Sequence, residues 1–369
     1  MEIFVRGFFH VNLGDDLFLY ILAKRYPNHN FHVILNEEYT KVFRDEKNII
    51  VHPYKKIRRG LDRFLINCNK DYYVEIEKKC QLNVVIGGSI FQENVDDVVA
   101  RERLARMPQL NPTYILGANF GPYVTEEYRL LVKDYLTKSE DVCFRDEWSK
   151  QKFPELTKVR FAPDIVFGIQ SIIPKVNEKK KRIFVSVVDC FKKAGGIKKY
   201  APNYEAFILR CINYYNEQGY EIILSSFCKM EGDKEVIDRI LEKLPSDKQS
   251  EISILNYNGE NWREVVAAIQ QSEKIIASRF HSMILGMVFG VSVLPIAYNK
   301  KFKQFLANFD LSHYCISVSD IDHQVPKNLN YLLFDGNTDI AEQANEHFMK
   351  LDERLMRGTL WNNEYYKNK

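Results

Sequence analysis

An arginine and a histidine, Arg279 and His281, stand where an apolar, strand-like run ends and an apolar, helix-like run begins. Burying a guanidinium without a partner costs several kcal/mol, so we expect an anion to meet this pair of residues. The start of a helix supplies free N–H groups and partial positive charge, which makes a phosphate the natural occupant. The alternative for His281 is a structural histidine whose hydrogen bonds are satisfied inside the fold.

Two further cations stand at the ends of strand-like runs. Arg145 carries a planar fork of donors that suits a phosphate or a carboxylate, and its alternative is an internal pair with Asp146 or Glu147. Lys301 follows a later run closely enough to reach the same anion, and its alternative is a solvated surface lysine. Together with Arg279, these residues predict a binding site for a small anionic molecule.

Two loops supply candidates for contacts with substrates. Asn12, Asp15 and Asp16 follow the first predicted strand, and such loops line the ligand crevice of an open α/β sheet. One aspartate is able to cap the next helix, and the other is then a candidate for accepting hydrogen bonds from sugar hydroxyls. Gly88 and Ser89 follow another apolar run, where a flexible, donor-rich turn suits an anion, although a Gly-Gly pair alone is a weak signal.

Short β-branched runs alternate with longer amphipathic runs, which is typical of βαβ units around parallel sheets. The predicted strands are Ile3–Arg6, Phe31–Leu35, Asn48–His52, Asn83–Ile86, Thr113–Leu116, Val142–Arg145, Ile183–Val188, Glu221–Ser225, Ile252–Leu255, Lys274–Ala277 and Ser292–Ile296. The clearest predicted helices are Asp15–Arg25, Glu126–Thr137, Tyr204–Glu217, Asp233–Leu244, Trp262–Gln271 and Ser282–Phe289. The pattern therefore predicts an α/β fold of two doubly wound, Rossmann-like halves that face a cleft.

A proline and a charge run interrupt this alternation at Ser171–Arg182, and we interpret this segment as a linker. We accordingly predict an N-terminal, acceptor-side domain over residues 1–174 and a C-terminal, donor-side domain over 182–335. Residues 336–369 include a final helix at about Ile340–Leu355, which is long enough to pack back across the interface. The pattern does not decide on which half that helix docks.

Composition excludes several classes of protein. The 369 residues allow about two ordinary cores, and a net charge of +3 gives no global field for nucleic acid. Seven cysteines without CxxC spacing fit reduced thiols, and the eight histidines lack the spacing of a metal cage, so we expect no metal. Charges and a proline interrupt the apolar tract Ile275–Ile296, which we interpret as strand, helix and strand. No export signal is recognisable at the N-terminus, so we expect a cytoplasmic protein.

Several motifs occur in the order known from the polysaccharide pyruvyl transferase family, which the chain resembles from Gly7 to about Leu306. The most specific is an Arg-aromatic-His motif at Arg279-Phe280-His281, followed at a matching distance by a segment from Tyr298 to Lys301. The other matching segments are Asn12-Leu13-Gly14-Asp15, Gly87-Gly88-Ser89, Gly121-Pro122, Arg145-Asp146-Glu147-Trp148-Ser149 and Ala162-Pro163-Asp164. The family often has three glycines where this chain has Gly87-Gly88-Ser89. It also often has Asp-Pro where this chain has Asn299-Lys300, which leaves open whether Lys300 or Lys301 is the ligand.

This resemblance implies a fold similar to the GT-B glycosyltransferases, phosphoenolpyruvate as co-substrate without any cofactor, and a pyruvyl ketal on a sugar as product. By matching motifs, Arg145 and Lys301 would bind the anionic donor and His281 would be the catalytic acid, with Arg279 beside it. Asp164 would face the acceptor or fix its own loop. The acceptor implied is a sugar on a polyprenyl-diphosphate carrier, a precursor of a capsule or exopolysaccharide.

Two other functions and one surface remain open. A nucleotide-sugar glycosyltransferase would share the cleft and the anion site, and a non-catalytic sugar or phosphate sensor would use the same cleft. A basic cluster of Lys55, Lys56, Arg58, Arg59 and Arg63 suits contact with an anionic membrane, such as the inner face of the plasma membrane. The alternative for this cluster is an ordinary solvated helix face.

Overall fold

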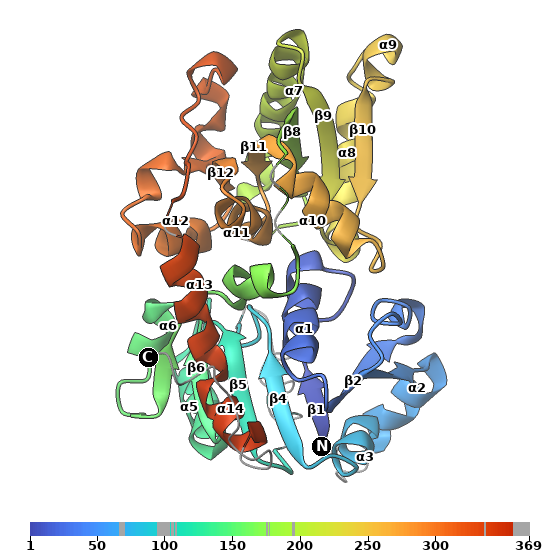
Figure 1. Cartoon of the computed structure of the whole chain (residues 1–369), viewed down its shortest axis with the longest axis vertical. Coiled ribbons are helices and arrows are strands. Elements are labelled where there is room, and N and C mark those ends of the chain that lie inside the picture. Colours follow the sequence, from blue (N-terminus) through green and yellow to red (C-terminus); the bar gives the residue numbers. More distant parts are fainter. Residues whose placement is uncertain are drawn as a thin grey trace.

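A computed structural model describes residues 1–65, 71–93, 104, 107, 109–174, 176, 178–193, 196–335 and 337–356. Within these ranges, the side chains of residues 63–65, 301, 337, 338 and 356 lie outside the description. The chain forms two α/β domains, one above the other in Figure 1, with the N-terminal domain below.

The N-terminal domain is built on a parallel sheet with the strand order β3-β2-β1-β4-β5-β6-β7. Its strands are β1 (Glu2–Arg6), β2 (Asn30–Asn36), β3 (Ile49–Tyr54), β4 (Leu82–Ile86), β5 (Thr113–Ala118), β6 (Asp141–Phe144) and β7 (Val159–Phe161). Its helices are α1 (Leu13–Arg25), α2 (Lys56–Leu65), α3 (Tyr72–Glu77), α5 (Glu126–Lys138) and α6 (Glu147–Gln151). Strands β2 and β3 are added on one side of β1, and the strands from β4 onward are added on its other side. This is the doubly wound order.

The C-terminal domain repeats this plan in the order β10-β9-β8-β11-β12-β13, again with parallel pairs. Its strands are β8 (Lys180–Ser186), β9 (Glu221–Ser226), β10 (Ile252–Asn256), β11 (Ser272–Ala277), β12 (Ser292–Ala297) and β13 (Ile316–Ser317). Its helices are α7 (Ala201–Glu217), α8 (Asp233–Leu241), α9 (Ser246–Gln249), α10 (Trp262–Gln270), α11 (Phe280–Val288) and α12 (Lys300–Ala307). The prediction of two doubly wound halves is confirmed.

The predicted linker differs from the observed chain path. Residues 175 and 177 lie outside the described part, and β8 begins at Lys180, within the charge run that we assigned to the linker. The first residues of β8 are exposed, so their charged side chains reach water while the backbone already pairs with β9 and β11. A strand end of this kind looks like a solvated linker in a sequence.

Helix α1 lies between the two domains and is buried on nearly all sides from Leu13 to Ala23. Its first backbone N–H, from Leu13, donates to the carbonyl oxygen of Phe227 in the other domain at 3.0 Å. Asn12 forms a β-bridge with Cys228 in the same loop of the C-terminal domain. The two domains are therefore joined directly at the start of α1, close to the loops that carry the predicted site residues.

The C-terminal segment returns to the N-terminal domain, as the red helices in Figure 1 show. The predicted single helix is in fact α13 (Asn337–Asn345), a 3-10 turn at Glu346–Phe348 and α14 (Met349–Met356). The helix is interrupted where His347 turns inward, receiving the N–H of Gly117 at 3.3 Å while its other ring nitrogen lies 2.8 Å from the carbonyl oxygen of Pro163. In α14, Asp352 binds Arg25 at the end of α1. The segment therefore braces both α1 and the loop before Asp164.

The long apolar tract forms β11, α11 and β12, as predicted from its interruptions. None of the helices in the described ranges combines the length and the apolar character needed to cross a bilayer.

Candidate functional site

Most of the predicted site residues with described side chains gather where the carboxyl ends of the two sheets face each other. Each sheet reverses its winding beside its first strand, at β1/β4 in one domain and at β8/β11 in the other. Ligands of open α/β sheets bind at such switch points, beyond the carboxyl ends of the strands. Two switch points facing across α1 therefore define the candidate site.

Arg145 follows β6 and is almost fully buried, with 7% of the residue exposed. Its Nη1 donates to Oδ2 of Asp164 at 2.8 Å, and its Nη2 donates to Oδ1 of Asn119 at 2.9 Å. The guanidinium carbon lies 4.8 Å from the ring centroid of Phe280, which belongs to the other domain. The Asp146 carboxylate caps α6 by accepting from the N–H of Ser149, and the internal ion pair that the structure shows for Arg145 is with Asp164.

Asp164 lies at the centre of the site and has no exposed surface. Burial raises the pKa of its carboxyl, but the hydrogen bond and charge of His281 and the charge of Arg145 outweigh that effect and hold the pKa below its ordinary value. Its other oxygen, Oδ1, accepts from the N–H of Val166 at 2.9 Å and so fixes the following 3-10 turn. The residue thus supplies a permanent negative charge and also orders its own loop.

His281 comes from the first turn of α11 and meets the N-terminal domain residues directly. Its Nε2 lies 3.4 Å from Nη1 of Arg145 and 3.6 Å from Oδ2 of Asp164. The ring rests on α1 at Gly14, where a Cβ atom would lie 1.7 Å from Nδ1 of His281. The side chain keeps 12% of its surface exposed. Two residues on distant segments, Arg145 and His281, are therefore brought together as neighbours.

Asp15 and the glycine turn after β4 line the same site. Oδ2 of Asp15 accepts from Nδ2 of Asn12 at 2.6 Å, and Oδ1 accepts the Gly88 N–H at 3.5 Å. Burial raises the pKa of Asp15, while the charges of His281 and Arg145 oppose that rise. This carboxyl is therefore a stronger base than an ordinary aspartate.

The turn after β4 needs its glycine. A Cβ on Gly88 would lie 2.6 Å from Nη2 of Arg145, so only a glycine leaves room for the guanidinium. Ser89 directs its Oγ to Oδ1 of Asn119 at 3.4 Å, and Asn119 also holds Arg145. Gly88 thus lies directly against Arg145, and Ser89 is connected to Arg145 through Asn119.

Asp16 has a different environment. Its Oδ2 accepts from the hydroxyl of Tyr257, which belongs to the C-terminal domain, at 2.7 Å. Burial raises the pKa of Asp16 well above its ordinary value, although the Tyr257 hydrogen bond acts in the opposite direction. Neither Asp15 nor Asp16 caps α1, because the helix begins at Leu13, before both residues. Asp16 therefore joins the domains, while Asp15 faces Gly88 and His281.

Arg279 lies between β11 and α11, as predicted, but is surrounded by carboxylates of the protein itself. Its guanidinium donates to Glu231 through Nη1 and to Asp233 through Nη2, and its Nε donates to the carbonyl oxygen of Val187 at 3.3 Å. Burial raises the pKa of Glu231, but the positive charges of Arg279 and Lys193 outweigh it and lower that pKa to about 2. The anions that meet Arg279 are thus internal side chains.

Lys301 lies in the first turn of α12, and its side chain is outside the part of the chain that the structure describes. Its neighbour Lys300 is exposed at the start of the same helix. Lys193 contacts Glu231 at 2.5 Å and lies 5.3 Å from the ring centroid of Tyr298. It is therefore a further cation beside this cluster.

Five residues that contact the predicted site residues or their partners were not predicted from the sequence: Asn119, Lys193, Glu231, Asp233 and Tyr257. Asn119 directly follows β5, so the rule that places ligand loops at strand ends would have found it. Lys193 and Glu231 carry no comparable signal, because their roles depend on contacts with distant segments.

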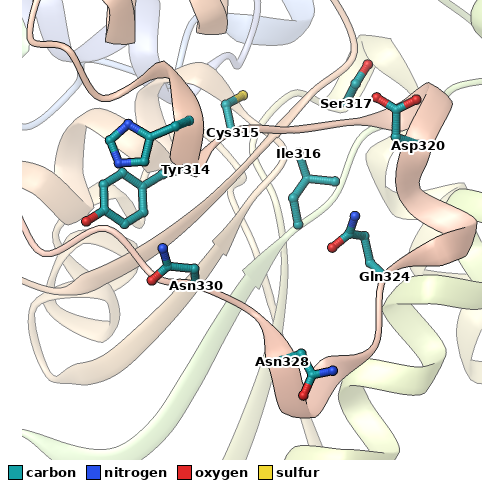
Figure 2. Close-up of a pocket in the computed structure, with 9 residues that line it drawn as sticks. Tyr314, Cys315, Ile316, Ser317, Asp320, Gln324, Asn328 and Asn330 are labelled. Carbon is teal, nitrogen blue, oxygen red and sulfur yellow. The ribbon is translucent and has the colours of Figure 1, made fainter.

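A cavity of about 250 Å³ lies elsewhere, around β13. Figure 2 shows its mostly polar lining, which includes Tyr314, Asp320, Gln324 and Asn328. None of the predicted site residues with a described side chain contributes to this lining. Across the described ranges, no group of three or more His, Cys, Asp or Glu side chains is arranged to hold a metal ion.

Comparisons with known proteins agree with this architecture. A family model described as polysaccharide pyruvyl transferase matches residues 12–300, which include the motifs at both switch points. No curated protein matches the chain in sequence. Among solved structures, the UDP-GlcNAc 2-epimerase of Neisseria meningitidis bound to UDP-GlcNAc aligns with a TM-score of 0.56 and 12% identity, over 96% of this chain and 100% of that chain.

A second solved structure is the UDP-GlcNAc 2-epimerase of Methanocaldococcus jannaschii in complex with UDP-GlcNAc and UDP. It aligns with a TM-score of 0.55 and 14% identity, over 95% of this chain and 99% of that chain. At these identities the likeness concerns the fold alone, and it confirms the predicted fold class of two Rossmann-like domains facing each other.

Proposed function

This chain belongs to the polysaccharide pyruvyl transferase family, and from that premise we propose that it transfers pyruvate from phosphoenolpyruvate to a sugar as a ketal. The contact between Arg145 and His281 carries the proposal, because it joins an anion-binding group and a proton donor at the switch points. A small, anionic donor that must be protonated during the reaction matches this combination.

Arg145 and the N-terminus of α11 hold the carboxylate and the phosphate of the donor. The guanidinium provides a planar fork, and the first turn of α11 adds N–H groups and partial positive charge. Lys301 of α12, or its neighbour Lys300, together with Gly88 and Ser89, completes the anion site. Arg279 supports the site as a positioning residue, because its guanidinium already binds Glu231 and Asp233.

His281 acts as the acid in the first step. Its protonated ring donates a proton to the methylene carbon of phosphoenolpyruvate, which becomes a methyl group and leaves the adjacent carbon electrophilic. The oxygen of one sugar hydroxyl bonds to that carbon and loses its proton, and the C–O bond to phosphate then breaks. A second hydroxyl of the same sugar bonds to the same carbon, its proton passes to the departing phosphate, and the ketal closes. Ring closure is intramolecular, which favours it strongly.

The proposed acid, His281, has a negatively charged neighbour. Asp164 lies 3.6 Å from Nε2 of His281 and stays ionised, since its pKa is held low. Its negative charge thus lies beside the nitrogen from which the proton is transferred.

The acceptor is a hexose of a lipid-linked glycan precursor, on a polyprenyl-diphosphate carrier at the inner face of the plasma membrane. Two of its hydroxyls, at positions 4 and 6, receive the ketal, in the biosynthesis of a capsule or an exopolysaccharide. Asp15, with its raised pKa and its place beside His281, is the candidate base for the attacking hydroxyl. Asn12 binds Asp15 and orients it.

The test is incubation of the purified protein with phosphoenolpyruvate and a panel of lipid-linked galactosides, mannosides and amino sugars. We expect stoichiometric release of inorganic phosphate and a product with the mass of a pyruvyl ketal. His281→Gln is the inactive control, and His313→Gln, at an exposed histidine outside the site, is the matched active control. Release of a nucleoside diphosphate from a nucleotide sugar would instead identify a glycosyltransferase, and donor binding without turnover would identify a sensor.

A further inference from the structure

The outer face of α2 exposes two large aliphatic side chains next to lysines. Ile57 has 81% of its surface exposed and Leu61 has 54%, and the two stand four residues apart on one side of the helix. Lys56 and Gly60 lie on the same arc, and a Cβ on Gly60 would meet open space. Single exposed apolar residues are ordinary, but two neighbouring aliphatic side chains beside exposed lysines form an amphipathic, positively charged surface.

The inner face of α2 fixes this orientation. Asp62 is buried and accepts from the hydroxyl of Tyr54 at 2.8 Å and from Nε of Arg58 at 2.9 Å. Arg59 donates from Nη1 to Oδ1 of Asn36 at 3.1 Å. Because these polar contacts hold one side of the helix to the domain, the aliphatic pair is directed outward by the fold itself.

The charges beside the pair select the kind of partner. Lys55 and Lys56 are both exposed at the start of α2, whereas Arg58 and Arg59 are engaged with Asp62 and Asn36. The side chain of Arg63, also in the basic cluster of the sequence, lies outside the description. Exposed lysines flanking an aliphatic stripe match an anionic lipid surface, which attracts the ammonium groups and accepts the aliphatic side chains between its headgroups.

The position of this face relates it to the candidate site. Helix α2 directly follows β3, so its first turn starts at the same carboxyl edge of the sheet as the loops after β1 and β4. The contact of Arg59 with Asn36, the last residue of β2, places that turn beside the edge. A surface bound through this turn would therefore lie on the same edge of the sheet as the loops that carry Asn12, Asp15 and Gly88.

We propose that the α2 face formed by Lys55, Lys56, Ile57 and Leu61 docks on an anionic phospholipid membrane. The biological purpose rests on the proposed function, because docking here would present the acceptor-side rim to a sugar on a membrane-embedded carrier. The binding itself is independent of any catalytic activity.

The experiment is sedimentation of the full chain with vesicles of phosphatidylcholine alone or mixed with phosphatidylglycerol, without donor or acceptor. We expect binding to the mixed vesicles that weakens as salt is added. The double variant Ile57→Gln/Leu61→Gln should bind about tenfold or more weakly, since two aliphatic side chains no longer enter the lipid. Lys55→Gln/Lys56→Gln should also bind about tenfold more weakly and lose most of the salt dependence.

Matched controls remove equivalent groups elsewhere. Val325→Gln/Leu333→Gln replaces two exposed aliphatic side chains, and Lys198→Gln/Lys199→Gln replaces two exposed lysines. Both should sediment like the unmodified protein. Equal binding to both vesicle types, no binding at all, or equal losses in the control variants would overturn the proposal. Loss of a dimer in the Ile57→Gln/Leu61→Gln variant would identify a second copy of the chain as the partner instead.

A second readout separates this proposal from the proposed function. With a short, water-soluble sugar acceptor, the α2 variants should turn over at the unmodified rate, because none of the described residues of the catalytic cluster belongs to α2. With the lipid-linked acceptor in vesicles, their rate should fall. An enzyme that is inactive on every acceptor but still binds the mixed vesicles would refute only the proposed function.

Discussion

Arg145 and Arg279 occupy equivalent places in the two domains but have opposite surroundings. Each follows a strand at the cleft-facing edge of its sheet and is about equally buried. Arg279 binds two carboxylates and a backbone carbonyl of its own domain. Arg145 binds one carboxylate and one amide, and it also meets an aromatic ring and an imidazole from the opposite domain.

The difference shows that residue type and strand position do not by themselves define an anion site. Two internal carboxylates pair with Arg279. Through these pairs and its bond to a backbone carbonyl, the residue holds the loops after β8 and β9 together. Arg145 has a single carboxylate, Asp164, which it shares with His281, so this group of three carries a net positive charge when the ring is protonated. We therefore expect chemistry at Arg145 and stability at Arg279.

The largest effect should come from removing the acid beside Arg145. His281→Gln should lower kcat by between about a hundredfold and ten-thousandfold, because general acid catalysis contributes that much. Steady-state phosphate release measures the loss, and urea unfolding should show nearly unchanged stability. Turnover near the unmodified level would show that the Arg145 region is not the reactive one.

Arg279→Met should mainly affect stability. Asp233, which is fully buried, would be left without its cation, and Glu231 would keep only Lys193; breaking a buried pair typically costs about 3 to 5 kcal/mol of unfolding free energy. Equilibrium urea unfolding measures this loss. Adding Asp233→Asn to the variant should restore part of it. If the single variant unfolds like the unmodified protein but loses donor affinity, then Arg279 binds the donor and its proposed structural role is wrong.

A conservative pair of variants sharpens the contrast. Lysine keeps the charge but lacks the planar fork, so Arg145→Lys should raise the KM for phosphoenolpyruvate about tenfold. Arg279→Lys should leave that KM unchanged in the folded protein. Initial rates over a range of donor concentrations decide the question, and equal changes in both variants would contradict the division of roles.

The smallest effect concerns acid stability around Arg279. The pKa of Glu231 is lowered from its ordinary value of 4.5 to about 2 in the folded protein, chiefly by the charge of Arg279 against the opposing effect of burial. A lowered carboxyl pKa stabilises the fold fully above the unfolded value, and this contribution is lost as the pH falls toward the folded value. The stability difference between the unmodified protein and Glu231→Gln should therefore shrink between pH 4.5 and about 2. A constant difference across this range would place Glu231 outside the ion cluster.

Much of the fold could be predicted because the hydrophobic pattern of a parallel sheet is local. The longer strands are continuous apolar runs between amphipathic helices, and their bounds agree with prediction to within a few residues. Strands β7 and β13 escaped because Val159–Phe161 and Ile316–Ser317 are too short to show a period. The break in the final helix escaped because it depends on the contacts of His347 with Gly117 and Pro163, far away in sequence.

The candidate site could be predicted in part for a similar reason. The rule for strand ends places Arg145 and His281 at facing edges, and the structure brings them into contact. The partners of each arginine could not be predicted. The sequence leaves Asp164 between an acceptor contact and a loop-fixing role and carries no signal for Glu231, because pairing depends on which loops meet across the sheet edges.

The contact between the two domains at His281 depends on the absence of a side chain at Gly14. The imidazole of His281 occupies the space that a side chain at this position would fill. A single methyl group there would act as a spacer, separating the proton donor from the guanidinium that it must work beside. Because Gly14 has no side chain, the two domains approach closely enough here for His281 and Arg145 to be neighbours.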